Sequence, residues 1–546
     1  MKHEISLLLG TNIKPSSSET AQIKKLLQAR RKDISDVGRE IERLQRRIRF
    51  LEECREDILG VVGELEGILS PAKNLVPEIA SRIFGFCLPD ASSEPHEPTT
   101  TSAPLNMAQV CQSWRSVALA TPALWSNPKV VVKPTNGSSA LLAQQFDRKT
   151  EMLRTWLHRS RGHPLTCSIK VYVRATLTPM FQGAIHELVS LLAPHSSSWK
   201  YIALNLPQVP QNMIILKDNF RGYLKHLRYL EIVETENPPS TQPHHWQLKL
   251  GHAPLLRGAY LSYFSPKEFT PSSLPWDQLR NVRLEDGISM VQALTLLKEC
   301  TTIEELSLNI KVVGRGGITP CTLPMLESLA VRGTLGTIHP FMDHITVPRL
   351  RSLTVNSYTK SQSRPSGSMG MGTGTGHYIN LKPFLERLER PLESFTLDDP
   401  HLTKSSIIIS YLRLLPSLRQ FAFTGAIDTV LILPLTPAET NGTTYTYLCP
   451  SLQFLEGNFQ CSAAALADMV EKRWEGRVVK KGYPPLKVVT FYSSSTLMGE
   501  VRDEVFSASD CVEYLRERLM HLYDQGLAID FNLDHPRQSM SSFRGS

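Results

Sequence analysis

The hexapeptide "LESLAV", residues 326–331, has apolar residues at its first, fourth and sixth positions. Three related stretches surround it: "LRNVRL" (279–284), "IEELSL" (303–308) and "LRSLTV" (350–355). The fourth-position residues Val282, Leu306, Leu329 and Leu353 are 24, 23 and 24 residues apart. Because alternate residues of a strand face the same side, this spacing indicates an internal repeat with one short strand per copy.

Further copies of the pattern occur on both sides of this group. They are "LRYLEI" (227–232), "LESFTL" (392–397), "LRQFAF" (418–423) and "LKVVTF" (486–491), with weaker copies "WKYIAL" (199–204) and "LQFLEG" (452–457). A single copy cannot bury its apolar side, but stacked copies share a continuous core. The sequence therefore predicts a curved α/β solenoid over 165–515, with a convex side made of helices or loops.

The period of the copies resembles that of leucine-rich repeats. Lys311, Thr334 and Tyr358 stand where such repeats usually have Asn, so the resemblance implies irregular copies. It also implies that a concave face binds a target protein through residues between the inward apolar positions. The candidates are Glu231, Arg283, Ser307, Thr354, Thr396 and Thr490.

Two segments do not fit the repeat. Residues 361–380, "SQSRPSGSMGMGTGTGHYIN", are rich in Gly and Ser and are expected to be a flexible insertion. A phosphate loop is not expected there, because the glycines neither follow a clear strand nor lead to a Lys-Ser/Thr helix start. Residues 530–546 are expected to be a disordered tail.

Residues 20–69 are predicted to form a coiled-coil helix with one narrow apolar seam. Heptad spacing assigns to this seam Leu27, Ile34, Val37, Ile41, Leu44, Ile48, Leu51 and Ile58. Such a seam needs a partner. The partner is either a second copy of the chain, giving a homodimer, or another surface of the same chain, and self-pairing is preferred.

The segment 70–130 is predicted to be a small all-α domain. In "SPAKNLVPEIASRIFGFCLPD" (70–90), Pro77-Glu78 suits a helix start, and Ile79, Ile83 and Phe86 lie on one helix face. After the loop 90–104, "PLNMAQVCQSWRSVALATPALW" (104–125) continues the apolar pattern. A unit this small cannot bury so much apolar surface by itself, so part of that surface is expected to contact another protein.

The two stretches resemble the F-box motif, in the form common in fungal proteins that carry an N-terminal coiled coil. The resemblance covers roughly residues 70–126, and Ala80 stands where Leu is usual. The matching residues are Leu75, Pro77, Glu78, Ile79, Ile83, Phe84, Leu105, Val110, Cys111, Trp114, Arg115, Leu124 and Trp125.

The resemblance implies that the chain binds a Skp adaptor, which links it to a cullin ubiquitin ligase core. It places at or beneath that interface Leu75, Pro77, Ile79, Ile83, Phe84, Val110, Cys111 and Trp114. Trp125 is instead expected to fill the core of the domain. The chain would then be a non-catalytic receptor subunit, with the target protein held by the solenoid.

Composition and motifs favour this class of protein over others. The net charge of +8 is modest for 546 residues, which argues against nucleic-acid binding. No apolar run is long enough for a signal sequence or a membrane span, so a cytoplasmic or nuclear location is expected. No cofactor or metal site is expected: His244 and His245 lie in a Pro-rich loop, and the nine cysteines show no CxxC spacing.

Two other functions stay open. The chain could be a non-degradative scaffold assembled through its coiled coil, or the solenoid could carry an enzyme site assembled from distant residues. No HExxH, GxSxG or Walker motif supports the second alternative.

Overall fold

The protein divides into two compact units, Met1–Ile83 and Phe84–Ser546. In the computed structural model, the described residues are 14–69, 71–88, 97–135, 138–172, 179–207, 223–235, 250, 252–262, 274–358, 378–399, 402–440, 444–479, 484–492, 495–498, 505–506 and 508–532. The first unit consists mainly of one long helix, α2 (Ser17–Leu69), followed by a short 3-10 turn, η1 (Pro71–Asn74), and the start of α3 (Pro77–Phe86).

Helix α2 begins with a reciprocal cap. The Ser16 backbone N–H donates to Glu19 Oε2 at 2.8 Å, and the Glu19 N–H donates to Ser16 Oγ at 3.3 Å. This arrangement satisfies two of the donors that every helix leaves open at its amino end. The helix then continues for 53 residues without a buried side chain. Its lack of a buried face means that tertiary packing within the described residues does not stabilise it.

The second unit starts with short helices and continues as a parallel sheet. The helices are the end of α3, α4 (Met107–Val110), α5 (Gln112–Ala120) and η2 (Pro122–Trp125). Within the described residues the sheet contains 16 strands, and its main path follows the order of the chain. That path is β1 (Lys129–Val132), β2 (Leu165–Val171), β3 (Trp199–Pro207), β4 (Tyr229–Thr235), β5 (Gly258–Leu261), β6 (Asn281–Ser289), β7 (Glu305–Val312), β9 (Ser328–Gly333), β11 (Ser352–Ser357), β12 (Ser394–Asp398), β13 (Gln420–Asp428), β16 (Phe454–Ser462), β17 (Val488–Tyr492) and β20 (Ala528–Asn532).

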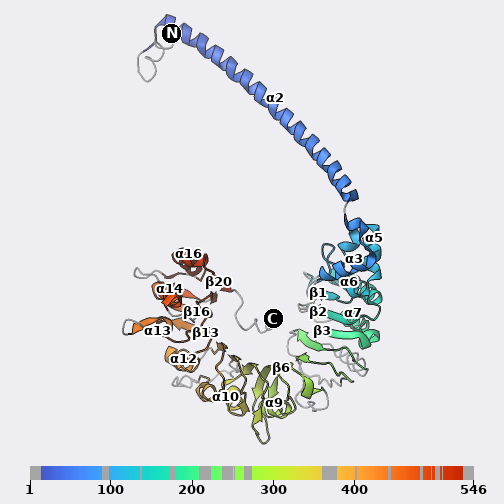
Figure 1. The fold of residues 1–546 in the computed structure, drawn as a ribbon, viewed down its shortest axis with the longest axis vertical. Helices are drawn as coiled ribbons and strands as arrows, with labels where there is room; N and C mark the ends of the chain where they lie inside the picture. The colour runs from blue at the N-terminus through green and yellow to red at the C-terminus, as the bar shows by residue number, and fades with distance from the viewer. Residues whose placement is uncertain are drawn as a thin grey trace. The chain divides into compact units, whose positions relative to one another are not determined.

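Minor strands and outer helices complete the second unit. The minor strands are β18 (Thr496–Met498) with β19 (Val505–Phe506), β8 (Cys321–Thr322) with β10 (Ile345–Thr346), and β14 (Ala438–Thr440) with β15 (Thr444–Thr446). The helices are α6 (Ser139–Ser160), α7 (Pro179–Ser190), η3 (Ala193–Ser198), η6 (Trp276–Gln278), α9 (Met290–Leu297), α10 (Leu335–Asp343), α11 (Lys382–Glu386), α12 (Ser405–Leu412), α13 (Thr429–Leu435), α14 (Ala463–Val479), α15 (Ala508–Arg518) and α16 (Met520–Tyr523). Within this unit the strands line the inner side of a curve and the helices its outer side (Figure 1).

The register of the strands explains the core. Leu306 of β7 lies beside Val282 of β6 and Leu329 of β9, and Leu329 lies beside Leu353 of β11. These fourth-position residues of the repeat form one buried row across the sheet. The sixth-position residues form a second buried row, which includes Leu308 and runs parallel to the first. The mixed α/β solenoid indicated by the repeat spacing is therefore present.

The sheet is longer than the predicted range of 165–515. It begins at Lys129 of β1 and ends at Asn532 of β20. Residues 530–532 pair with β17, so the tail expected from 530 does not begin there. Residues 533–546 lie outside the described residues.

The expected insertion at 361–380 lies between two strands that pair directly. Leu353 of β11 lies beside Phe395 of β12, so no further described strand separates them in the sheet. Residues 361–377 lie outside the described residues. Residues 378–380 differ from the expectation of a flexible segment, because Ile379 is buried and its N–H donates to Asp399 Oδ2 at 3.0 Å.

A buried arginine fixes the packing of the last repeats. The Arg473 side chain of α14 donates to the carbonyl oxygens of Leu435 at 2.9 Å, Cys449 at 3.1 Å and Leu448 at 2.8 Å. Burial lowers the pKa of Arg473 to about 10, which still leaves it charged at neutral pH. One guanidinium therefore satisfies three backbone acceptors. One carbonyl lies at the end of α13, and the other two lie in the turn before β16.

We predict that Arg473→Met lowers the free energy of unfolding by about 3 kcal/mol or more, because three buried carbonyls lose their donor. The neighbouring substitution Lys472→Met removes an exposed cation from the same helix and should change stability by less than about 0.5 kcal/mol. Urea denaturation followed by tryptophan fluorescence measures both. Equal midpoints for the two variants would contradict this role of Arg473.

Candidate docking surfaces

Helix α3 carries an exposed apolar face. Ile79, Ile83 and Phe86 follow i, i+4, i+7 spacing and are 46%, 40% and 89% exposed. Ala80 and Phe84 lie on the other side of the helix and are buried. The helix starts at Pro77, as the sequence predicts, and the Val76 carbonyl accepts from the N–H groups of both Ile79 and Ala80. The exposed face therefore belongs to a helix whose first turn is hydrogen-bonded to Val76.

Helices α4 and α5 present a second exposed apolar position, Val110, which is 61% exposed. Cys111 separates the two helices with an extended backbone, and its sulfur accepts from the Trp114 N–H at 3.5 Å. The Trp114 ring is half-buried and lies 5.0 Å from the ring of Phe84. Val110 and Cys111 are thus exposed at a helix junction, whereas Trp114 packs partly inside the unit.

The predicted adaptor residues are divided between the two units. Leu75, Pro77, Ile79 and Ile83 belong to the first unit, and Phe84, Val110, Cys111 and Trp114 belong to the second. Leu75 is half-buried and Pro77 is exposed. That they form one interface stays a prediction. Phe86 is the exposed residue of the α3 face that the eight candidates omit, although its helical spacing was visible in the sequence.

Trp125 lies in the core of the second unit, as expected. Its indole Nε1–H donates to the Ala118 carbonyl at 2.8 Å, and its ring contacts the Trp156 ring edge to face at 5.2 Å. The Arg159 guanidinium lies 4.4 Å from the centre of the same ring. This tryptophan joins the short helices to α6 and does not contribute to an exposed surface.

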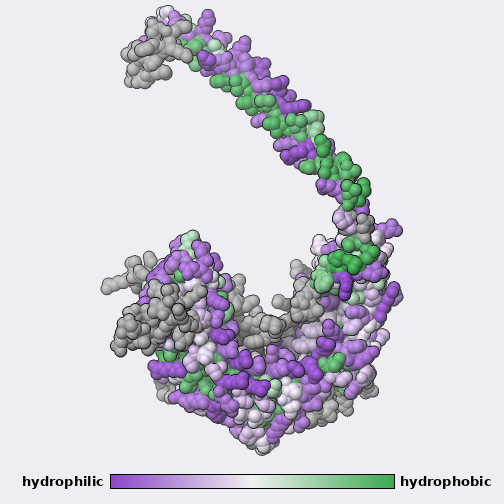
Figure 2. Space-filling view, in the orientation of Figure 1, coloured by the Kyte–Doolittle hydropathy of each residue, from purple (hydrophilic) through white to green (hydrophobic). Residues whose placement is uncertain are grey.

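The heptad seam of α2 is exposed along its whole length. The eight predicted seam residues, from Leu27 to Ile58, are between 50% and 71% exposed. Apolar side chains run along the helix beside charged ones (Figure 2). Exposed ion pairs, such as Arg43 with Glu40 at 2.8 Å, occupy other positions of the helix. An apolar seam flanked by charges is the pattern of a helix that pairs with another helix.

The candidate target-binding residues form one row across the inner side of the sheet. Glu231, Arg283, Ser307, Thr354, Thr396 and Thr490 share a register position, together with Tyr260, Ala330, Ala422 and Glu456. The regular period of the repeat thus predicted correctly that these residues align. A hollow of about 110 Å³ lies on this row over β4 to β9.

Part of this row is engaged in contacts within the protein. The Tyr201 hydroxyl donates to Glu231 Oε2 at 3.3 Å. The Arg283 guanidinium lies 4.6 Å from the Tyr260 ring centre and 3.0 Å from Glu285 Oε1. Burial raises the pKa of Tyr260, so its hydroxyl stays protonated. The half-buried Ser307, Thr396 and Thr490 are less constrained and suit contacts with a partner.

The His and Cys side chains of the described residues bear on metal binding and thiol reactivity. They contain no group of three or more His, Cys, Asp or Glu side chains that could hold a metal ion, and His244 and His245 lie outside them. None of the nine cysteines forms a disulfide. Burial raises the pKa of Cys167, Cys300 and Cys449 to about 12, which keeps these thiols protonated and poorly nucleophilic. No helix in the described ranges has the length and apolar character needed to span a bilayer.

We predict that Trp125→Ala lowers the free energy of unfolding of the second unit by about 3–5 kcal/mol, because it removes a fully buried ring and its hydrogen bond. Val110→Ala, at an exposed site close in sequence, should cost less than about 0.5 kcal/mol. Thermal denaturation of both variants tests this. A small effect of Trp125→Ala would contradict its assignment to the core.

Comparison with known proteins identifies no family. No protein-family model matches the chain, and no curated protein matches it. Among solved structures, a chain from the crystal structure of the Rad7 and Elc1 complex in yeast is similar over 81% of this chain and 94% of that chain. The sequence identity is 11% and the TM-score is 0.33, a similarity too low to support a conclusion about fold or function.

Proposed function

We propose that this chain is an F-box substrate receptor of an SCF-type cullin ubiquitin ligase. The observation that carries the proposal is the face of α3 formed by Ile79, Ile83 and Phe86, which is exposed in a helix that follows the F-box sequence pattern. Burying a side chain of this kind in a complex is worth about 1.5–3 kcal/mol. An amphipathic helix that inserts such a face into a groove is a common mode of recognition between proteins.

The adaptor would bind α3 together with the exposed positions Val110 and Cys111. Leu75, Pro77 and Trp114 would support the contact at its edges, and Phe84 would support it from the buried side of the helix. Catalysis is assigned to other subunits of the ligase, so the chain itself would be a non-catalytic receptor.

The target protein would bind the inner side of the sheet. The row that includes Ser307, Thr396 and Thr490 presents small polar side chains, and the neighbouring hollow over β4 to β9 gives a partner side chain a place to enter. Small hydroxyl groups accept and donate hydrogen bonds without covering the backbone. This supports recognition of a protein surface or an extended segment by the inner face.

Helix α2 would pair with α2 of a second copy of the chain. Its exposed seam runs from Leu27 to Ile58, interrupted by Arg30 and Arg55, and a homodimer would bury it in two symmetric halves. A dimeric receptor holds two target sites near each other, which raises the effective concentration for a target with two binding segments. The same seam supports the second candidate function, a scaffold assembled through the coiled coil without ligase activity.

We predict that Ile79→Asp weakens binding of the Skp adaptor by about 100-fold, because it places a charge in an apolar contact and removes an anchor. The matched control is Val430→Asp on α13, which changes an exposed apolar residue of similar size far along the repeat. Surface plasmon resonance with the purified adaptor measures both. Unchanged affinity of the Ile79 variant, or adaptor binding absent from the unmodified chain, would refute the receptor proposal and leave the scaffold.

We predict that the chain sediments at twice its mass of 61.3 kDa and that Leu51→Glu raises the dimer dissociation constant at least about tenfold. The adjacent Phe50→Glu replaces an equally exposed apolar residue outside the seam and should leave the constant unchanged. Analytical ultracentrifugation distinguishes the two variants. A monomer at all concentrations would instead favour pairing of the seam with another surface of the same chain.

A further inference from the structure

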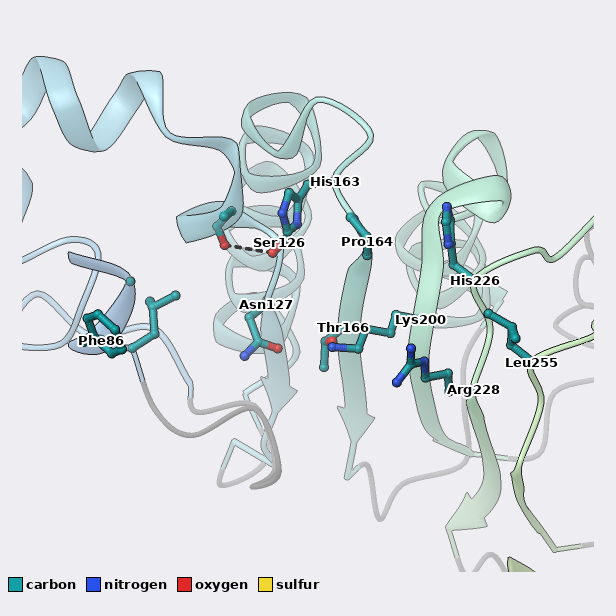
Figure 3. Close-up of a pocket in the computed structure, with 13 residues that line it drawn as sticks. Phe86, Ser126, Asn127, His163, Pro164, Thr166, Lys200, His226, Arg228 and Leu255 are labelled. Atoms are coloured by element: carbon teal, nitrogen blue, oxygen red, sulfur yellow. Dashed lines mark hydrogen bonds between the residues drawn. The ribbon is translucent and has the colours of Figure 1, made fainter. Parts of the chain in front are cut away.

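A cavity of about 660 Å³ lies in the second unit, where strands β1 to β4 begin. It is lined by Gly85, Phe86, Leu88, Ala123, Ser126, Asn127, His163, Pro164, Thr166, Lys200, His226, Arg228 and Leu255. Figure 3 shows Asn127, Thr166, Lys200 and Arg228 in sequence across the amino-terminal ends of these four strands. The volume is within the range of about 300–1,000 Å³ that is usual for small-molecule sites.

The polar part of the cavity is basic. Lys200 of β3 and Arg228, just before β4, lie beside each other, His226 lies on the same side of the cavity, and His163 lies beside Ser126 (Figure 3). None of the lining residues is acidic. In the described part of the chain, no salt bridge joins any of these four side chains to a carboxylate. The cavity therefore holds cationic charge that the described structure does not neutralise.

Along the rest of this sheet edge, several cations at the same repeat position pair with carboxylates. Lys200 and Arg228 occupy the repeat position just before the buried rows, and the Arg228 N–H donates to the Lys200 carbonyl at 2.8 Å. Further along this edge, Arg280 pairs with Glu304 at 2.9 Å, and Glu393 lies 3.6 Å from both Arg351 and Arg419.

From β7 onward this edge position mixes carboxylates with cations, in the order Glu304, Glu327, Arg351, Glu393 and Arg419. At β3, β4, β5 and β6 the corresponding residues are Lys200, Arg228, Arg257 and Arg280, four cations in succession. Arg280, the last of them, pairs with Glu304. Lys200 and Arg228, which begin this run, are the two cations of the run that line the cavity.

The cavity also offers uncommitted polar groups and an apolar end. Asn127 Oδ1 is buried and has no hydrogen-bond partner among the described residues. The Thr166 side chain lies between Asn127 and Lys200 (Figure 3). Leu88, Pro164 and Leu255 supply apolar lining. The cations Lys200 and Arg228 together with this apolar lining therefore suit a ligand that combines an anionic group with an apolar group.

We propose that this cavity binds a phosphate monoester attached to an apolar or aromatic group. A phosphate monoester carries close to two negative charges at neutral pH, which matches the ammonium of Lys200 and the guanidinium of Arg228. The guanidinium binds two phosphate oxygens through its planar fork, and the lysine acts as a point charge. The third oxygen would accept from Thr166 or from the Asn127 amide. The cavity shares Phe86 with the proposed adaptor face, but its phosphate-binding residues are not part of that face, so either proposal can fail alone.

Isothermal titration calorimetry of the full chain at physiological ionic strength, with phenyl phosphate as the probe, tests the proposal. We expect saturable binding that weakens about tenfold for each cation removed in Lys200→Gln and Arg228→Gln. Arg228→Lys keeps the charge but loses the fork, and should give an intermediate affinity. Lys487→Gln is the matched control, because Lys487 is an exposed cation at the same edge position before β17.

A second measurement uses the unmodified chain and does not depend on how variants fold. Phenyl phosphate should protect Lys200 from acylation, detected by mass spectrometry, and should leave Lys487 equally reactive. A short peptide with phosphotyrosine that binds more tightly than phenyl phosphate would identify the source as a modified protein. A phosphotyrosine peptide that binds no more tightly than phenyl phosphate would favour a small phosphorylated metabolite as the source. Both results support the site.

Three results would overturn the proposal. They are no saturable binding of phenyl phosphate, equal affinity of the Lys200→Gln/Arg228→Gln double variant, and binding of inorganic phosphate or benzoate as tight as that of phenyl phosphate. The last would show that the apolar end or the doubly charged group is not recognised.

Discussion

The parallel pairing of each repeat with the next is the constraint on which the second unit depends. A short strand of this sheet buries two apolar side chains, such as Leu306 and Leu308, and satisfies its backbone only through both neighbours. A slip of one residue would move Ser307 into the core and Leu306 out of it. The register is therefore strongly specified, and it decides which sequence position of every repeat faces the core, the inner side or the edge.

Because the register places each repeat position on a fixed surface, it also explains where charged side chains gather in the second unit. The second residue of each copy is usually Arg, Lys or Glu, and stacking brings these residues into one line along the edge of the sheet. Each exposed Arg–Glu pair in that line contributes little to stability, since solvent screens it. Mixing Arg with Glu along the line nevertheless reduces repulsion between like charges. In the run from Lys200 to Arg280, the described residues place a carboxylate only beside Arg280, which is the reason for proposing an anionic ligand at Lys200 and Arg228.

The sequence was sufficient to predict those features that follow from local spacing. The sequence predicted the repeat copies that have Leu or Val at the fourth position. It also predicted the apolar face of α3 and the alignment of Ser307, Thr396 and Thr490 in one row. Strand β5 was missed because Ala259 and Gly258 replace large residues there. A Cβ atom on Gly258 would lie 2.3 Å from the Tyr229 ring, which stacks on the Tyr201 ring. The basic cavity was missed for a related reason, since Asn127, Lys200 and Arg228 are far apart in sequence and meet only when the strands stack.

Helix α3 has a buried side and an exposed side, and its one departure from the F-box pattern lies on the buried side. Ala80 stands where the family usually has Leu, and it lies on the buried side of the helix, with 2% of its surface exposed. A larger side chain there would overpack the buried side at a cost of about 1–3 kcal/mol unless the neighbours adjusted. The small residue thus belongs to the internal packing of the helix. Ile79, Ile83 and Phe86 on the exposed side are unaffected by the departure, so it removes no side chain that the proposed adaptor would contact.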